Sequence, residues 1–191
     1  MQFIDISHDK HSAYRLKAYE SAVFFALNRS GEITVELLGE GAVAHIFAFF
    51  TGEENDKQTL NIVQKHLAPK TSSSALVKAV LKDKAELYYE GTIKVEKKAQ
   101  GSNASQDSRS LLLSPEASAH TKPALEILAD DVACHHAATV SPLNESLLLY
   151  IESRGLSRKQ ASDLLTQGFF QESIEKIVAL GVQEEHIPKI L

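Results

Sequence analysis

The sequence of 191 residues has no tryptophan and a single cysteine, Cys134. One cysteine cannot form an internal disulfide, which excludes a disulfide-stapled secreted domain and fits a reducing compartment. No apolar run comes near the roughly 18 residues that span a bilayer, and the first residues lack the pattern of a signal peptide. We therefore expect a cytoplasmic protein that does not enter a membrane.

The sequence also lacks an excess of positive charge, because it has 20 basic and 25 acidic residues and a net charge of −5. Neither half of the chain is strongly basic, so a nucleic-acid-binding role has little support. The sequence contains no glycine-rich phosphate loop, no nucleophile elbow and no zinc-protease motif. We expect a chain that neither binds ATP nor performs acyl transfer by itself.

The segments from residue 2 to about 132 are typical of short strands. Apolar and polar residues alternate over 5 to 9 positions at a time, and turn residues separate the segments. This pattern predicts an all-β body, either a sandwich or a solenoid. Asn-Gly and Asp-Gly hairpin turns are missing, which favours parallel coils with looser corners. The polar stretch Lys94–Ser110 is predicted to be an exposed loop.

Helical spacing begins near the end of the body. Ser141 and Pro142 have the residue types of an N-cap and a first helical position, and Gly155 is expected to end that helix. Further signals are a capping box at Ser157–Gln160, a third helix over about 171–180 and a short turn near 184–190. We divide the chain into a β body, 1–139, and a helical tail, 140–191.

Cys134 and His136 form the only pair of soft metal ligands near this junction. In an extended strand they point to one face and His135 points to the other. A closed metal site normally needs four ligands. The residues alone therefore leave two interpretations: a structural cysteine beside surface histidines, or a site completed by another chain, by other histidines or by exogenous ligands.

The tail also carries an aromatic and aliphatic stripe that includes Tyr150, Phe169 and Phe170. Packing within the tail and against the body is one interpretation. Because a short helical tail has limited capacity to bury such a stripe, a partner-docking face is the other.

The stretch KPALEILADDV at Lys122–Val132, followed by Cys134, His136 and Tyr150, resembles the SufB/SufD family of iron–sulfur cluster assembly proteins. The Cys-x-His-x-Ala-Thr form is more similar to SufD than to SufB. Ser108 stands where SufB-like chains carry a cysteine, and the N-terminal region is shorter than in most members. Other matching segments are Ala138-Thr139, Ser153–Leu156, His66–Pro69 with Thr71, Lys78–Leu81, Gly91–Ile93 and Ser110–Ser114.

The resemblance implies a right-handed parallel β-helix followed by a C-terminal helical domain. It implies a non-catalytic scaffold subunit that works with a SufB-like subunit and a SufC-like ABC ATPase. Iron or a transient iron–sulfur cluster would lie at the SufB interface, held in part by His136 and its neighbour Cys134, and the chain would hold no cofactor by itself. The tail would dock the ATPase, for which we select Tyr150, Arg154, Gly155, Phe169 and Phe170.

Two other functions stay open from the sequence. One is a stand-alone metal-binding β-solenoid protein. The other is a purely structural, homodimeric binding module, since a chain of this kind can self-associate when alone.

Overall fold

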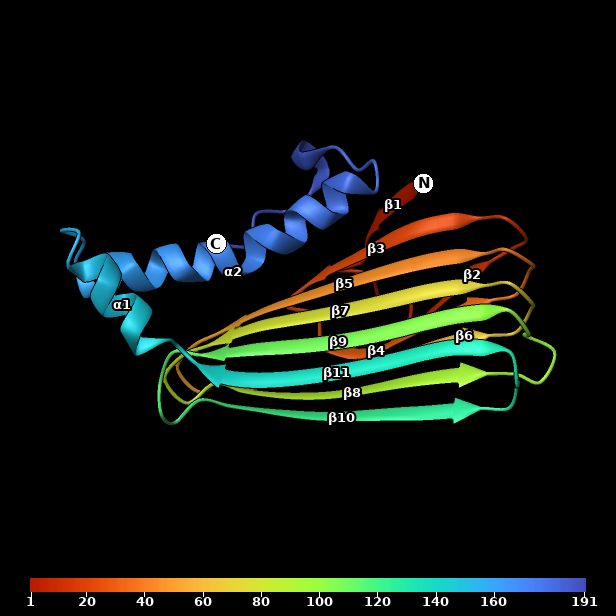
Figure 1. The fold of residues 1–191 in the computed structure, drawn as a ribbon, viewed down its shortest axis with the longest axis horizontal. Helices are drawn as coiled ribbons and strands as arrows, with labels where there is room; N and C mark the ends of the chain where they lie inside the picture. Colours follow the sequence, from red (N-terminus) through yellow and green to blue (C-terminus); the bar gives the residue numbers. More distant parts are fainter.

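The computed structural model describes residues 1–191 as a parallel β-solenoid followed by two α-helices (Figure 1). One sheet contains β1 (Gln2–Asp5), β3 (Ser21–Leu27), β5 (Val43–Gly52), β7 (Ser72–Leu81), β9 (Ser102–Leu112) and β11 (Val132–Pro142). The other contains β2 (Ala13–Leu16), β4 (Gly31–Leu37), β6 (Lys57–His66), β8 (Glu86–Val95) and β10 (Ser118–Ile127). The helices are α1 (Glu145–Glu152), α2 (Arg158–Ala179) and the short 3₁₀ helix η1 (Glu184–His186).

The chain alternates between the two sheets, and each strand pairs in parallel with the strand two places earlier. One even-numbered strand and the odd-numbered strand after it form one coil. Equivalent positions in successive coils stack, as Phe24, Ile46 and Ala75 do in the register of β3, β5 and β7. This stacking buries a continuous apolar core between the sheets. The predicted parallel β-helix with a helical tail is confirmed.

The predicted exposed loop at Lys94–Ser110 is wrong. Lys94 lies within β8, and Ser102 begins the eleven-residue strand β9. The inward positions of β9 include Ser102, Gln106, Ser108 and Ser110, all of which are buried. Small hydroxyl side chains fit the narrow interior and form hydrogen bonds to residues of neighbouring coils. A polar composition therefore does not indicate solvent exposure in this segment.

His66 is the clearest example of this polar interior. Its side chain is fully buried at the end of β6, where hydrogen bonds of 2.8 Å join Nδ1 to Thr71 Oγ1 and Nε2 to Ser73 Oγ. Thr71 Oγ1 in turn lies 2.8 Å from Ser102 Oγ in the next coil. Burial lowers the pKa of His66 from 6.5 to about 4.

We expect this histidine to make folding stability depend on pH. The unfolded chain takes up the proton near pH 6.5 and the folded chain only near pH 4. Stability is therefore complete above pH 6.5, declines as the pH falls towards 4, and loses about 3 kcal/mol in total. Urea unfolding of the wild type and a His66→Gln variant from pH 7.5 to 4 measures the difference. The exposed His120→Gln variant should keep the wild-type slope, and a wild-type slope in His66→Gln would contradict the assignment.

Two details of the helical tail differ from expectation. Ser141 and Pro142 do not start a helix, because β11 stays paired with β9 as far as Pro142 opposite Leu112. The N-cap is Asn144, whose Oδ1 accepts the Leu147 N–H at 3.0 Å.

The predicted second and third helices are one continuous helix, α2. The capping box of Ser157 and Gln160 at its start is confirmed. No proline or left-handed residue interrupts α2, so its backbone hydrogen bonds continue through Gly168. The turn predicted near 184–190 is present as η1.

Helix α2 packs on the outer face of the sheet that contains β3, β5 and β7 (Figure 1). Phe170 inserts against Phe49 with ring centroids 5.6 Å apart. Lys78, whose side chain is almost fully buried, donates to the Phe169 carbonyl at 2.6 Å and to Glu172 Oε2 at 3.1 Å. Apolar packing and one buried cation therefore fix the C-terminal half of α2 to the solenoid.

Candidate functional site

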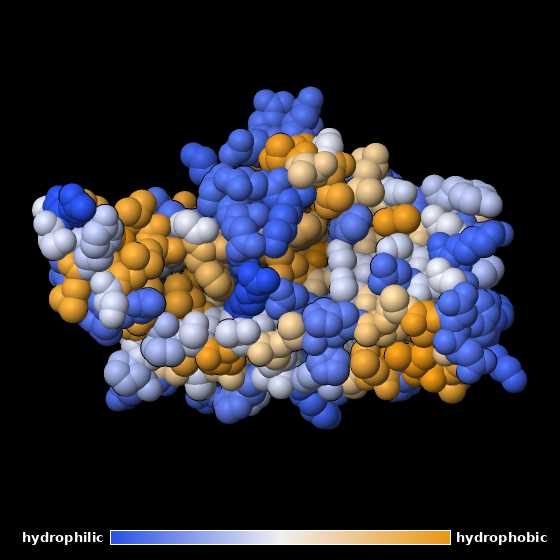
Figure 2. Space-filling view, in the orientation of Figure 1, coloured by the Kyte–Doolittle hydropathy of each residue, from blue (hydrophilic) through white to orange (hydrophobic).

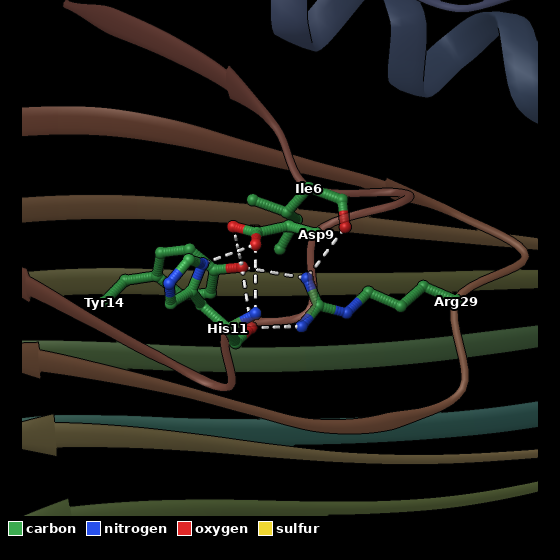
Figure 3. A network of polar contacts seen from close by, with 5 residues as sticks. All are labelled: Ile6, Asp9, His11, Tyr14 and Arg29. Carbon is green, nitrogen blue, oxygen red and sulfur yellow. Dashed lines mark hydrogen bonds and ion pairs between the residues drawn. The ribbon is translucent and has the colours of Figure 1, made fainter.

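The loop between β1 and β2, at the first end of the solenoid, is held by a network of polar contacts (Figure 3). The segment between β1 and β2 buries Ile6 completely. Arg29 Nη1 donates to the Ile6 carbonyl at 2.8 Å and to the Tyr14 hydroxyl at 2.9 Å, while Nη2 donates to the His11 carbonyl. The Tyr14 hydroxyl donates to Asp9, and hydrogen bonds from the His11 backbone and ring lower the pKa of Asp9 to about 2. These contacts hold a loop against the first strands.

The last coil, formed by β10 and β11, ends both sheets without such a covering network. Strand β10, of 10 residues, pairs only with β8, and β11, of 11 residues, pairs only with β9 (Figure 1). The edge strands at the other end, β1 and β2, have only four residues each. Each strand therefore has one edge whose backbone N–H and C=O groups lack a neighbouring strand. A free edge of this length is a template for pairing with another chain. We call the surface formed by β10 and β11 the open end.

Inward-facing apolar side chains are exposed at the open end. Leu125 and Ile127 of β10 are each 38% exposed, whereas Ile93 and Val95, their register partners one coil earlier, are 0% and 1% exposed. Val140, near the end of β11, is 43% exposed. Figure 2 shows apolar surface at the lower right of the molecule, where β10 ends and β11 begins in Figure 1. A further layer of protein would bury these side chains as the last coil buries Ile93 and Val95.

Cys134 and His136 lie on the edge strand β11. In the β9 register they align with the buried Ala104 and Gln106, so both face the interior side, while His135 aligns with Ser105 on the outer side. The predicted sharing of one face is confirmed. Cys134 is partly buried, and this burial raises the pKa of its thiol. His136 is exposed.

The open end brings two soft ligands together but not a complete metal site. The structure contains no group of three or more histidine, cysteine, aspartate or glutamate side chains placed to hold a metal ion. An imidazole and a thiol that becomes a thiolate on binding suit iron or an iron–sulfur cluster as partial ligands. The two donors form a partial site that further ligands would have to complete.

Three of the residues selected for partner docking are accessible. Tyr150 on α1 is 55% exposed, and the Arg154 guanidinium lies over its ring at 5.2 Å and donates to its hydroxyl at 3.2 Å. Gly155 follows with a φ of 100°, a conformation that favours glycine, and a side chain there would meet open space. Together they form an exposed corner between α1 and α2.

The two phenylalanines of the predicted stripe lie elsewhere. Phe170 is 2% exposed and packs on Phe49, so it belongs to the contact between α2 and the solenoid. Phe169 is partly buried, with Lys78 Nζ 4.7 Å from its ring centroid. Within the folded chain, both rings contribute to packing, and Phe170 is not free to contact another protein.

Leucines near the corner are exposed as well. Leu164, which belongs to the predicted stripe, is 49% exposed, and Leu147 and Leu149 of α1 are 43% and 61% exposed. Helix α1 and the first half of α2 project past the strand ends, and Figure 2 shows apolar surface on this projecting part at the left. We call Leu147, Leu149, Tyr150 and Leu164 the docking face. Helical periodicity identified the apolar positions, and the structure shows which of them are left uncovered.

Comparison with known proteins gives the family. Residues 11–169 match the family described as SUF system FeS cluster assembly, SufBD core domain. The chain belongs to the SufBD family. Protein ABCI7, chloroplastic, of Arabidopsis thaliana is 38% identical over 133 residues, which are 68% of this chain and 28% of that protein.

Bacterial relatives agree with this assignment. Iron–sulfur cluster assembly SufBD family proteins of Staphylococcus saprophyticus and Staphylococcus epidermidis are each 30% identical over 135 residues, which cover 71% of this chain and 29% of each relative. The SufBD chain thus spans less than a third of the length of these curated relatives. Neither of its α-helices combines the length and apolar composition needed to cross a lipid bilayer.

Proposed function

We propose that this SufBD chain is a SufD-like, non-catalytic scaffold subunit for iron–sulfur cluster assembly. Its partner at the open end is a SufB-like subunit, which pairs along the free edges of β10 and β11. The observation that carries this proposal is the exposure of Leu125 and Ile127, whose equivalents one coil earlier are fully buried. A partner that supplies the missing layer buries these side chains and satisfies the edge hydrogen bonds.

Ser108 supports the SufD-like assignment over a SufB-like one. SufB-like chains carry a cysteine at this position. Here the Ser108 side chain is buried, and its Oγ lies 3.4 Å from Thr121 Oγ1. A serine cannot accept sulfur as a persulfide, because that chemistry requires a thiolate. Sulfur acceptance is therefore assigned to the partner rather than to this chain.

His136 and Cys134 would hold iron or the nascent cluster as transferable cargo at the shared interface. His136 is the first ligand in this proposal because it is exposed on the inward side of the free edge strand. Cys134 is second, since its raised pKa keeps the thiol protonated at neutral pH until metal displaces the proton. The partner supplies the remaining ligands.

The docking face would bind a SufC-like ABC ATPase, together with Arg154 and Gly155 of the adjoining corner. The support is an exposed group of leucines on the projecting helices, because apolar side chains on unpacked helices favour a protein partner. In the absence of a SufB-like subunit, a second copy of this chain would use the same open end. The cytoplasmic location expected from the sequence stays a prediction.

A single substitution tests the cluster site. We expect His136→Ala to lower the yield of iron–sulfur cluster on the assembled complex by about 10-fold or more, because loss of even an outer-shell partner of a metal ligand costs about 10-fold to 100-fold. The complex itself should form normally, since the exposed imidazole forms no hydrogen bond or ion pair that holds the chain together. The matched control is His135→Ala, one residue away and facing outward, which should keep the wild-type yield. Absorbance at 420 nm and iron content measure the outcome.

A wild-type yield in the His136→Ala complex would remove the site assignment. Cys134→Ser is expected to have a smaller effect than His136→Ala, and a larger one would reverse the order of the two ligands.

A further inference from the structure

A cleft lies between the first half of α2 and the turns at the ends of the odd-numbered strands. Its volume is about 550 Å³. The solenoid side includes Glu53 and Asp56 from the turn between β5 and β6, and the helix side includes Asp163 and Thr166. The cleft therefore lies between the two parts of the chain, a common place for ligand binding.

The charge of the cleft is negative. Three carboxylates line it, from Glu53, Asp56 and Asp163, and the single cation among the lining residues is Lys82. Lys82 Nζ already lies 3.8 Å from a carboxylate outside the cleft, that of Asp83. Neither Glu53 nor Asp163 forms an ion pair within the chain, so the cleft attracts an additional cation.

Besides its carboxylates, the cleft has a hydroxyl without a hydrogen-bond partner and some apolar surface. Thr166 is only 6% exposed and lines the cleft, yet its buried Oγ1 has no hydrogen-bond partner. Buried polar groups normally have partners, so this acceptor is available to a donor that enters the cleft. Val80 and Leu113 supply apolar surface in the same cleft.

We infer that the cleft takes a basic side chain, a lysine or an arginine, from the ATPase that docks on the adjoining helices. This inference rests on the proposed function. Leu164 of the docking face directly follows Asp163 in α2 and is 49% exposed, so the docking face and the cleft involve the same turn of the helix. The methylene stem of the basic residue lies against Val80 and Leu113. Its charged head donates to the carboxylates and to Thr166 Oγ1.

Charge reversal on either wall tests this contact. We expect Asp163→Lys and Glu53→Lys each to weaken binding of a SufC-type ATPase by about 30-fold or more, and Asp163→Asn by less. The matched control is Glu175→Lys, an exposed carboxylate later on the same helix that does not line the cleft, which should bind like the wild type. Calorimetric titration of the full chain with the ATPase at low and high salt measures these affinities. Wild-type affinity should fall with salt more steeply than that of Asp163→Asn.

Thr166→Val separates a binding role from a structural one. Because the hydroxyl has no partner in the free chain, we expect no loss of folding stability and a several-fold loss of affinity for the ATPase. Wild-type affinity in both Asp163→Lys and Glu53→Lys overturns this inference and leaves the docking proposal intact. Failure of the wild-type chain to bind the ATPase at all overturns both.

Discussion

Leu125→Glu is expected to reduce affinity for the SufB-like subunit by at least about 100-fold, because it buries an unpaired carboxylate in the interface. Leu125 faces the interior side of β10 and is 38% exposed in the free chain. In the free chain the glutamate can reach water, so folding should be retained. In the complex it would lie in the layer that the partner covers.

The matched control for this variant is Leu38→Glu. Leu38 is 44% exposed, close to the value for Leu125, but it follows β4 in an early coil and lies outside the open end. We expect this control to bind the partner like the wild type. Affinities come from titration of the labelled chain with the purified partner. Equal, near-wild-type binding by both variants would show that the partner does not cover the open end.

Gly39→Ala is expected to destabilise the fold by about 3 kcal/mol or more. A Cβ atom at Gly39 would overlap the backbone nitrogen of Ala18 and lie 2.6 Å from the carbonyl carbon of Lys17. These neighbours are backbone atoms of the stacked turn before, so neither a rotamer change nor a small side-chain shift relieves the clash. The two turns must separate, which disturbs the register of the first coils.

Gly168→Ala is the matched control, with an effect of opposite sign. Gly168 lies inside α2, and a Cβ atom there would meet nothing within 4 Å. We expect a gain of up to about 1 kcal/mol from helix propensity. Urea unfolding of both variants measures the difference. A Gly39→Ala variant as stable as the wild type would contradict the close approach of the two turns.

The order of strands and helices follows from local patterns in this sequence. Period-two alternation and missing hairpin turns predicted a parallel β body, and the capping residues Ser157 and Gln160 predicted the start of α2. The shared face of Cys134 and His136 follows from strand geometry alone. These features depend on near neighbours in the chain, which is why the sequence is sufficient to predict them.

Features that depend on distant contacts were not predictable in this way. The polar strand β9 resembles a loop because its inward serines are satisfied only by other coils, as Ser102 is by Thr71. Phe170 is an apolar helix residue like Leu164, but one packs on Phe49 and the other faces solvent. The difference depends on where α2 crosses the solenoid, and helical periodicity contains no information about that crossing.

The buried Lys78 shows the same limit at a single residue. A lysine within a strand is expected to face solvent. Here its Nζ reaches the Phe169 carbonyl and Glu172, more than 90 residues later, and burial lowers its pKa. Only the tertiary arrangement brings these groups together.

The central claim, that a SufB-like subunit covers the open end, is tested most directly by amide hydrogen exchange of the chain alone and in the assembled complex. The account predicts strong new protection of the backbone amides of β10 and β11 in the complex, and unchanged exchange in β1 and β2 at the opposite end. A complex that forms with β10 and β11 exchanging as they do in the free chain would contradict it.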